Sequence, residues 1–151
     1  MTGSMTTTTL FKRHLVDRSR LEDLDVSNLP FGRVFSDHMF TMEYADGEWK
    51  TGEILPFQNL QMSPATMVLH YGQAIFEGMK AFRSREGEIL MFRPEDNINR
   101  FNISAERMCM PVVDADLFME ALHQLIDADR NWVPADVNSA LYIRPFMIAT
   151  D

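Results

Sequence analysis

The residues from His70 to Pro111 constrain the fold more tightly than any other part of this chain. Within them, Met79–Arg83 and Ile89–Arg93 are two short apolar runs, and the Glu86-Gly87 pair between them is typical of a tight turn. Apolar runs on either side of such a turn predict an antiparallel hairpin. We therefore expect two paired strands here.

A helix is expected directly after this hairpin. Pro94 suits the first helical turn, because the fixed backbone angle of proline is already helical and its missing N–H is not needed there. Pro111 predicts the end of the helix. Apolar residues between them recur at steps of three and four, which predicts one buried face. The residues of that face are Ile98, Phe101, Ala105 and Met108.

A second hairpin and a short helix are expected before this region. Val34–Tyr44 and Trp49–Pro56 are rich in β-branched and aromatic residues, and Asp46-Gly47 between them is a hairpin-turn pair. Ser63 followed by Pro64 predicts the start of a helix, with the serine as its cap.

The C-terminal third predicts one more helix and one more strand. Asp114 is expected to cap the helix. Its buried stripe is Phe118, Ala121, Leu122, Leu125 and Ile126. Ala140–Ala149 reads as a strand, and Pro145 within it indicates an edge or a bulge.

Hairpins separated by helices predict an α+β fold with a mainly antiparallel sheet and helices packed on it. We place the domain at residues 31–151 and interpret residues 1–30 as a leader, in which residues 1–4 before Met5 look like a cloning remnant. No polar tail follows the last strand, so we expect the sequence to continue into a further domain that this chain does not contain.

The charge of the chain argues against two classes of partner. There are 22 acidic and 14 basic side chains, which give a formal net charge of −8. Such a surface disfavours nucleic acid and anionic membranes. No segment has the roughly 18 consecutive apolar residues that a membrane-spanning helix needs.

Cysteine and histidine give no sign of a metal site. The single cysteine, Cys109, excludes an intrachain disulfide and a cysteine-rich metal centre, and its methionine neighbours predict a buried side chain. The four histidines lack the spacing of metal ligands. We therefore predict no metal.

Two arginines are candidates for binding anions. Arg100 lies off the centre of the apolar face of its predicted helix, where a guanidinium can bind two phosphate oxygens or simply be solvated. Tyr142 and Arg144 are two residues apart on a predicted strand and so share a face. That pair could hold a carboxylate, or it could be a surface cation–aromatic contact.

Four aromatic residues are candidates for lining a pocket, although each could equally pack in a core. They are Phe35, Tyr71, Phe76 and Tyr142. Glu77 could act in catalysis, but we favour a role in fixing the backbone beside Gly78. The residues alone therefore predict an α+β domain with a candidate anion-binding arginine.

Eight short strings, taken together and in order, resemble the N-terminal domain of branched-chain-amino-acid aminotransferases, pyridoxal-phosphate enzymes of fold type IV. The resemblance runs from about residue 30 to the end. The strings are Phe35–Met39, Pro56–Leu60, Leu69–Tyr71, Phe76–Phe82, Phe92–Pro94, Asn97–Arg100, Trp132–Pro134 and Leu141–Pro145.

The resemblance implies a role for each candidate. Arg100 would bind the phosphate of pyridoxal 5'-phosphate, and Arg144 would bind the substrate carboxylate or fix the pocket edge. Phe35, Tyr71, Phe76 and Tyr142 would line the pocket for a branched side chain, with Tyr71 also a candidate for the neighbouring subunit's site. The complete enzyme would be a cytoplasmic homodimer that transfers the amino group of leucine, isoleucine or valine to 2-oxoglutarate.

The chain departs from the family in one respect. Its only lysines are Lys12, Lys50 and Lys80, and none matches the Schiff-base position, which the resemblance places in the second domain. The glutamate that pairs with the pyridine nitrogen is expected there too. The resemblance thus implies no catalytic residue in this chain, and we expect the chain alone to be inactive and not to bind the cofactor.

Three alternatives stay open. The same fold serves D-amino-acid aminotransferases and aminodeoxychorismate lyases, which would line the pocket differently. A stand-alone binding or assembly domain is the third. In the isolated chain, the rings of Tyr71, Phe76 and Tyr142 are expected to be exposed as an apolar patch.

Overall fold

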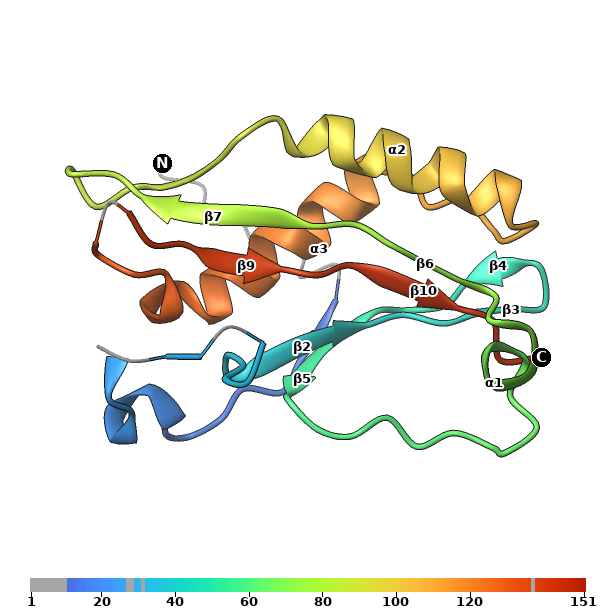
Figure 1. The fold of residues 1–151 in the computed structure, drawn as a ribbon, viewed down its shortest axis with the longest axis horizontal. Coiled ribbons are helices and arrows are strands. Elements are labelled where there is room, and N and C mark those ends of the chain that lie inside the picture. The colour runs from blue at the N-terminus through green and yellow to red at the C-terminus, as the bar shows by residue number, and fades with distance from the viewer. Residues whose placement is uncertain (1–10, 27–28, 31, 137) are drawn as a thin grey trace, which may run out of the picture. The chain divides into compact units, whose positions relative to one another are not determined.

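The computed structural model describes residues 11–26, 29–30, 32–136 and 138–151 (Figure 1). The chain divides into two compact units, Met1–Phe57 and Gln58–Asp151, and each is described by itself. Residues 1–4, which we interpret as a cloning remnant, lie outside the described residues. None of the helices in the described ranges is long and apolar enough to cross a membrane.

The first unit contains a three-stranded sheet in the order β1–β5–β2 and the small hairpin β3–β4. Its elements are β1 (Lys12–Arg13), η1 (Arg20–Asp23), β2 (His38–Thr41), β3 (Tyr44–Ala45), β4 (Glu48–Trp49) and β5 (Glu53–Pro56). β2 and β5 are antiparallel, whereas β1 joins β5 in parallel. Asp46 and Gly47 both have positive φ, 56° and 83°, which a two-residue hairpin turn requires. The predicted hairpin is confirmed.

The second unit contains the other antiparallel strands and the three α-helices. Its elements are α1 (Met67–Tyr71), β6 (Ala74–Phe76), β7 (Met79–Arg83), β8 (Ile89–Met91), α2 (Pro94–Arg107), α3 (Ala115–Ala128), η3 (Arg130–Trp132), β9 (Leu141–Ile143) and β10 (Phe146–Ile148). The sheets are β8–β7–β9 and β10–β6, and every pairing in them is antiparallel. The predicted α+β fold with a mainly antiparallel sheet is confirmed.

The strands β6 and β7 face β10 and β9 in one unbroken register. Phe76 is opposite Phe146, and Met79 is opposite Ile143. Between these pairs the Glu77 N–H donates to the Pro145 carbonyl at 2.9 Å, and proline has no N–H to return the bond. The ladder is therefore interrupted at Glu77-Gly78 without a shift in register. Of the two alternatives for Pro145, the edge position is correct and the bulge is not.

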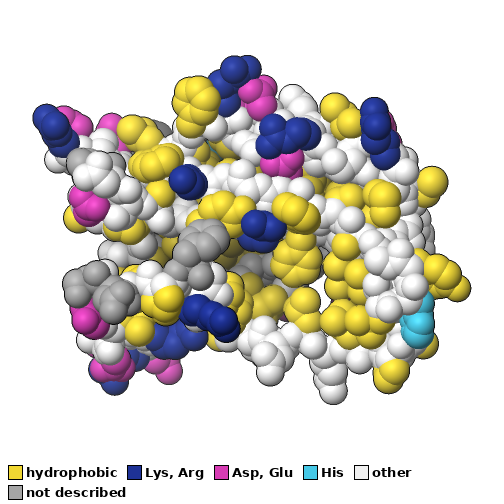
Figure 2. Space-filling view, in the orientation of Figure 1, with side chains coloured by type: hydrophobic (Ala, Val, Ile, Leu, Met, Phe, Trp, Pro, Cys, Tyr) yellow, Lys and Arg dark blue, Asp and Glu magenta, His cyan; other side chains and the backbone are white. Residues whose placement is uncertain are grey.

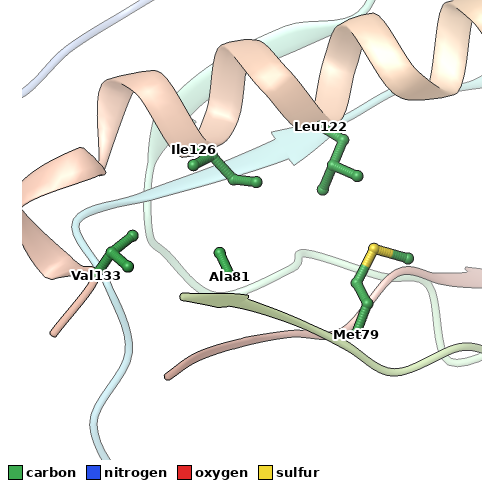
Figure 3. Close-up of a cluster of buried hydrophobic side chains, with 5 residues drawn as sticks. All are labelled: Met79, Ala81, Leu122, Ile126 and Val133. Carbon is green, nitrogen blue, oxygen red and sulfur yellow. The ribbon is translucent and has the colours of Figure 1, made fainter. Parts of the chain in front are cut away.

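The core of the second unit lies between α3 and the sheet. Leu122 and Ile126 point from α3 toward Met79 and Ala81 on β7, and Val133 closes the end of this cluster (Figure 3). The cap of α3 is as predicted, because Asp114 Oδ1 accepts a hydrogen bond from the Leu117 N–H at 2.9 Å. These contacts hold β7 and β9 in place, and with them the side chains on the other face.

Helix α2 begins at Pro94 as predicted. It buries Ile98, Phe101 and Ala105 of the predicted face, but the fourth residue, Met108, lies beyond its end and is exposed. It ends earlier than Pro111, however. Cys109 has a positive φ of 54°, and the Met110 N–H donates back to the Ala105 carbonyl at 2.8 Å.

This left-handed end corrects one prediction. It turns the Cys109 side chain outward, so Cys109 is exposed and its neighbour Met110 is buried instead. The expectation of a buried cysteine was wrong, because the backbone reversal falls on the cysteine itself.

The predicted start of α1 was also wrong. Ser63 Oγ does accept from the Ala65 N–H at 3.1 Å, but this closes only a turn. Thr66 is in a non-helical conformation, and the N–H groups of Met67 and Val68 donate to carbonyls of Thr150 and Ala149. The helix therefore starts at Met67, held by the last residues of the chain.

Candidate functional site

The predicted site residues fall in both units. Phe35 lies in the first unit, where its ring stacks on Phe57 with 4.7 Å between ring centroids and 9° between planes. The Arg20 guanidinium donates hydrogen bonds to the carbonyls of Phe35 and Ser36, and these bonds fix the backbone of this segment. One face of the Phe35 ring is thus used by Phe57, and about half of the side chain is exposed.

In the second unit, Phe76, Tyr142 and Arg144 lie together. Arg144 Nη2 donates to Tyr142 Oη at 2.6 Å. The guanidinium carbon of Arg144 is 4.4 Å from the centroid of the Phe76 ring and 5.2 Å from that of Tyr142. Tyr142 and Arg144 share a face, as their spacing predicts. Two aromatic rings and a hydroxyl hold this guanidinium, and its other N–H groups suit a carboxylate.

Gly78 makes room for Tyr142. A Cβ atom on Gly78 would overlap Tyr142 Oη and lie 3.0 Å from Tyr142 Cζ. The position therefore needs glycine because the tyrosine ring lies against the backbone there, although the backbone angle itself is not left-handed. Gly78 thus fixes where the hydroxyl of Tyr142 meets Arg144.

Arg100 is bound to Glu77 through two hydrogen bonds. Nε donates to Oε1 at 2.5 Å, and Nη2 donates to Oε2 at 2.6 Å. The Glu77 side chain is 7% exposed, whereas that of Arg100 is 63% exposed. Asn97 Nδ2 adds a bond to Oε2 at 3.0 Å, and the Gly78 N–H adds one at 3.3 Å. The carboxylate is buried and fully bonded, while the guanidinium reaches the surface.

These bonds keep both partners charged. The hydrogen bond from Arg100 is the main cause that lowers the pKa of Glu77, with smaller help from Asn97 and the Gly78 N–H, while burial acts the other way. Glu77 in turn raises the pKa of Arg100. The site therefore holds a fixed, permanently charged guanidinium.

The Glu77–Arg100 pair and the cluster of Phe76, Tyr142 and Arg144 lie on opposite faces of the β6–β7 segment. Ile75, Glu77 and Met79 are buried, whereas Phe76 and Lys80 are exposed, which is the alternation of a strand with one covered face. Glu77 and Arg100 thus belong to the covered side, where α2 lies beside β6 (Figure 1). Phe76, Tyr142 and Arg144 belong to the open side.

Tyr71 lies at the end of α1 and is 74% exposed, and Phe76 is 64% exposed. Tyr142 is only partly exposed, because it packs over Gly78. Hydrophobic side chains are prominent at the surface near α1 and the β6–β10 pair, at the right of the view in Figure 2. The expected exposure is thus confirmed for two of the three rings.

The pairing of Arg100 with Glu77 was not predicted from the sequence. Glu77 was assigned to fixing the backbone, and the carboxylate does bind the Gly78 N–H, but its main contacts are with Asn97 and Arg100. Asn97 and Arg100 are three residues apart on a helix, a spacing that indicates a shared face. The spacing could therefore have shown that Asn97 and Arg100 share a partner. It could not have shown that the partner is Glu77, which lies on a different element. Among the described residues, no group of three or more acidic, histidine or cysteine side chains could hold a metal.

The Glu77–Arg100 pair predicts an acid-sensitive fold. The folded-state pKa of Glu77 is lowered, so the pair stabilises the protein fully above the unfolded-state pKa, near 4.3, and loses this effect as the pH falls through the folded-state value. Between about pH 5 and pH 3, the free energy of unfolding should fall more steeply in the parent than in Glu77→Gln. Urea titrations measure this, with Glu95→Gln on the exposed face of α2 as the control. Equal slopes in parent and Glu77→Gln would contradict the pairing.

No family model matches the chain. The branched-chain-amino-acid aminotransferase 2 of Bacillus subtilis is 50% identical over 128 residues, which cover 84% of this chain and 35% of that protein. A solved branched-chain amino acid aminotransferase from Escherichia coli is 26% identical with a TM-score of 0.55, covering 76% of this chain and 34% of the other. Another, solved in complex with N-(5'-phosphopyridoxyl)-L-glutamate, is 25% identical with a TM-score of 0.53, covering 71% and 31%.

The chain spans about a third of the length of the relatives it matches, in their N-terminal region. The sequence match and the fold match point to the same class of protein. The resemblance predicted from the short strings is therefore confirmed: this chain is related, in sequence and in fold, to the N-terminal region of branched-chain-amino-acid aminotransferases.

Proposed function

We propose that this chain is the part of a branched-chain-amino-acid aminotransferase that binds the cofactor's phosphate and lines the substrate pocket. The complete enzyme transfers the amino group of leucine, isoleucine or valine to 2-oxoglutarate. The observation that carries the proposal is the 50% identity over 128 residues with the Bacillus subtilis aminotransferase. The cofactor is pyridoxal 5'-phosphate, and a relative has been solved with a phosphopyridoxyl compound.

Arg100 suits the phosphate. The bonds to Glu77 use Nε and Nη2, and most of the side chain surface faces solvent, so an incoming dianion can reach the guanidinium. When bound, pyridoxal phosphate withdraws electrons from the α-carbon of the substrate and carries the amino group between the two substrates. The lysine that binds the cofactor covalently comes from outside this chain, since Lys12, Lys50 and Lys80 do not match its position.

The open face of the strand suits an amino acid. Arg144, held by Tyr142 and by the Phe76 ring, binds a carboxylate or fixes the pocket edge. The rings of Tyr71, Phe76 and Tyr142, all in the second unit, supply apolar surface, which a branched aliphatic side chain needs. Each of these side chains binds or orients the substrate, and none of them moves a proton. The chain by itself is inactive.

The complete enzyme is a cytoplasmic homodimer. The exposed Tyr71 supports this assembly, because a ring that is 74% exposed can contribute to the site of a neighbouring subunit. The net charge of −8 argues against nucleic acid and anionic membranes as partners.

An amino-transfer assay on the complete protein tests the proposal. Leucine, isoleucine and valine should each donate to 2-oxoglutarate, and D-alanine should not. Arg100→Ala should lower the activity and the amount of bound cofactor by about 100-fold, the size expected when a fixed cation is lost from an anion site. Arg107→Ala, on the same helix, should leave both unchanged. Full activity in Arg100→Ala would overturn the phosphate role, and activity with D-alanine alone would overturn the substrate class.

A further inference from the structure

The carboxylate of Glu77 is buried, whereas the guanidinium of Arg100 that it binds is exposed. Its two oxygens accept bonds from Arg100 Nε and Nη2, Asn97 Nδ2 and the Gly78 N–H. Asn97 Nδ2 also bonds to the Gly78 carbonyl at 3.3 Å, so the amide is itself held by the strand. The acid, the amide and the interrupted backbone thus form one rigid support for a surface arginine.

Such a support changes what the arginine can do. A free arginine side chain has many rotamers, and binding an anion requires most of them to be lost. Two parallel bonds to a buried carboxylate leave the guanidinium one orientation before any ligand arrives. The side chain therefore loses its conformational entropy when the protein folds, not when the anion binds. The exposed edge of the guanidinium is already in position.

We propose that Glu77 is a positioning residue for anion binding by Arg100, with Asn97 as its second support. The inference rests on the proposed phosphate role of Arg100 and adds the group that acts through it. The charge of Glu77 opposes this role, because a carboxylate repels a phosphate. Positioning and electrostatics therefore predict opposite effects when the charge of Glu77 is removed.

Asp96 provides the matched control. Its charge acts on Arg100 through space, but its own bond is to Arg93 Nη2, at 2.6 Å. Asp96→Asn and Glu77→Gln each remove one negative charge near the same guanidinium. Only Glu77→Gln also breaks the two-bond support, because its amide nitrogen replaces one of the two oxygens that accept from Arg100.

The experiment titrates inorganic phosphate into the complete enzyme from which the cofactor has been removed, and isothermal titration calorimetry measures the dissociation constant. We expect Glu77→Gln to bind phosphate about tenfold more weakly than the parent, the size typical when an outer residue that orients a binding group is lost. Asp96→Asn should bind as tightly as the parent or more tightly. Equal or tighter binding by Glu77→Gln would overturn the proposal, because charge alone would then explain both variants.

Two further variants keep the result decisive. If Glu77→Gln does not fold, as judged by circular dichroism, Asn97→Ala decides: binding weakened about threefold supports the positioning role, and unchanged binding overturns it. Arg100→Ala separates this inference from the proposed function. If Arg100→Ala binds phosphate like the parent, the phosphate role itself fails. If it loses binding while Glu77→Gln keeps it, only the positioning role fails.

Discussion

Replacing Ile98 with alanine is expected to lower the free energy of unfolding by about 3 kcal/mol, within the range for buried isoleucine. Ile98 is 0% exposed and belongs to the buried face of α2. Alanine would lose the contacts of three carbon atoms and leave a cavity that the surrounding side chains fill only in part. Because small proteins are stabilised by about 5–15 kcal/mol, a large share of the total would be lost. Urea unfolding followed by circular dichroism measures the change.

Ile103 on the same helix is the control. It is 53% exposed, so the same substitution there should change the free energy of unfolding by less than about 0.5 kcal/mol. The comparison removes the effect of helix propensity, which favours alanine at both positions. Similar losses at Ile98 and Ile103 would mean that α2 does not bury the face described above.

Replacing Gly78 with alanine should move the Tyr142 ring and break its hydrogen bond to Arg144. The added Cβ atom would occupy the space of Tyr142 Oη, and the ring carbon Cζ would be only 3.0 Å away. We expect a stability loss of about 1–3 kcal/mol from overpacking. In the complete enzyme the KM for the amino acid should rise about tenfold, which is the effect of a misplaced carboxylate-binding group. Urea unfolding and steady-state kinetics measure the two effects.

The double variant Gly78→Ala/Tyr142→Phe tests the cause. Removing Oη removes the nearest atom in the overlap, so Tyr142→Phe should cost less stability in the Gly78→Ala background than in the parent. Such non-additivity is expected only for side chains in contact. Additive losses would show that the glycine is needed for another reason.

Local patterns predicted the parts of the fold that are held by local forces. The proline start and the apolar stripe of α2 are set by residues within four positions of one another, so the spacing alone located the helix. The Asp114 cap and the Asp46-Gly47 turn are short-range in the same way. The shared face of Tyr142 and Arg144 follows from strand geometry and needed no partner.

Two of the errors and omissions have long-range causes, and the third has a local one. Ser63 failed to start α1 because the N–H groups of Met67 and Val68 bond to Thr150 and Ala149, at the far end of the chain. Arg100 and Glu77 are separated by 23 positions, and nothing in the local spacing pairs them. Cys109 was wrongly predicted to be buried because the chain reverses direction at that residue, after the end of α2, rather than at Pro111. Each outcome was decided by a contact or a reversal that local spacing does not specify.

The unbroken register across Glu77-Gly78 and Arg144-Pro145 has an evolutionary consequence. Side chains alternate along a strand, so inserting or deleting one residue here would turn Glu77 toward solvent and a phenyl ring inward. Both guanidinium supports would be lost at once. Lineages that share this segment should therefore differ from it by substitution, and gain or lose residues only in connections such as the Arg83–Ile89 turn.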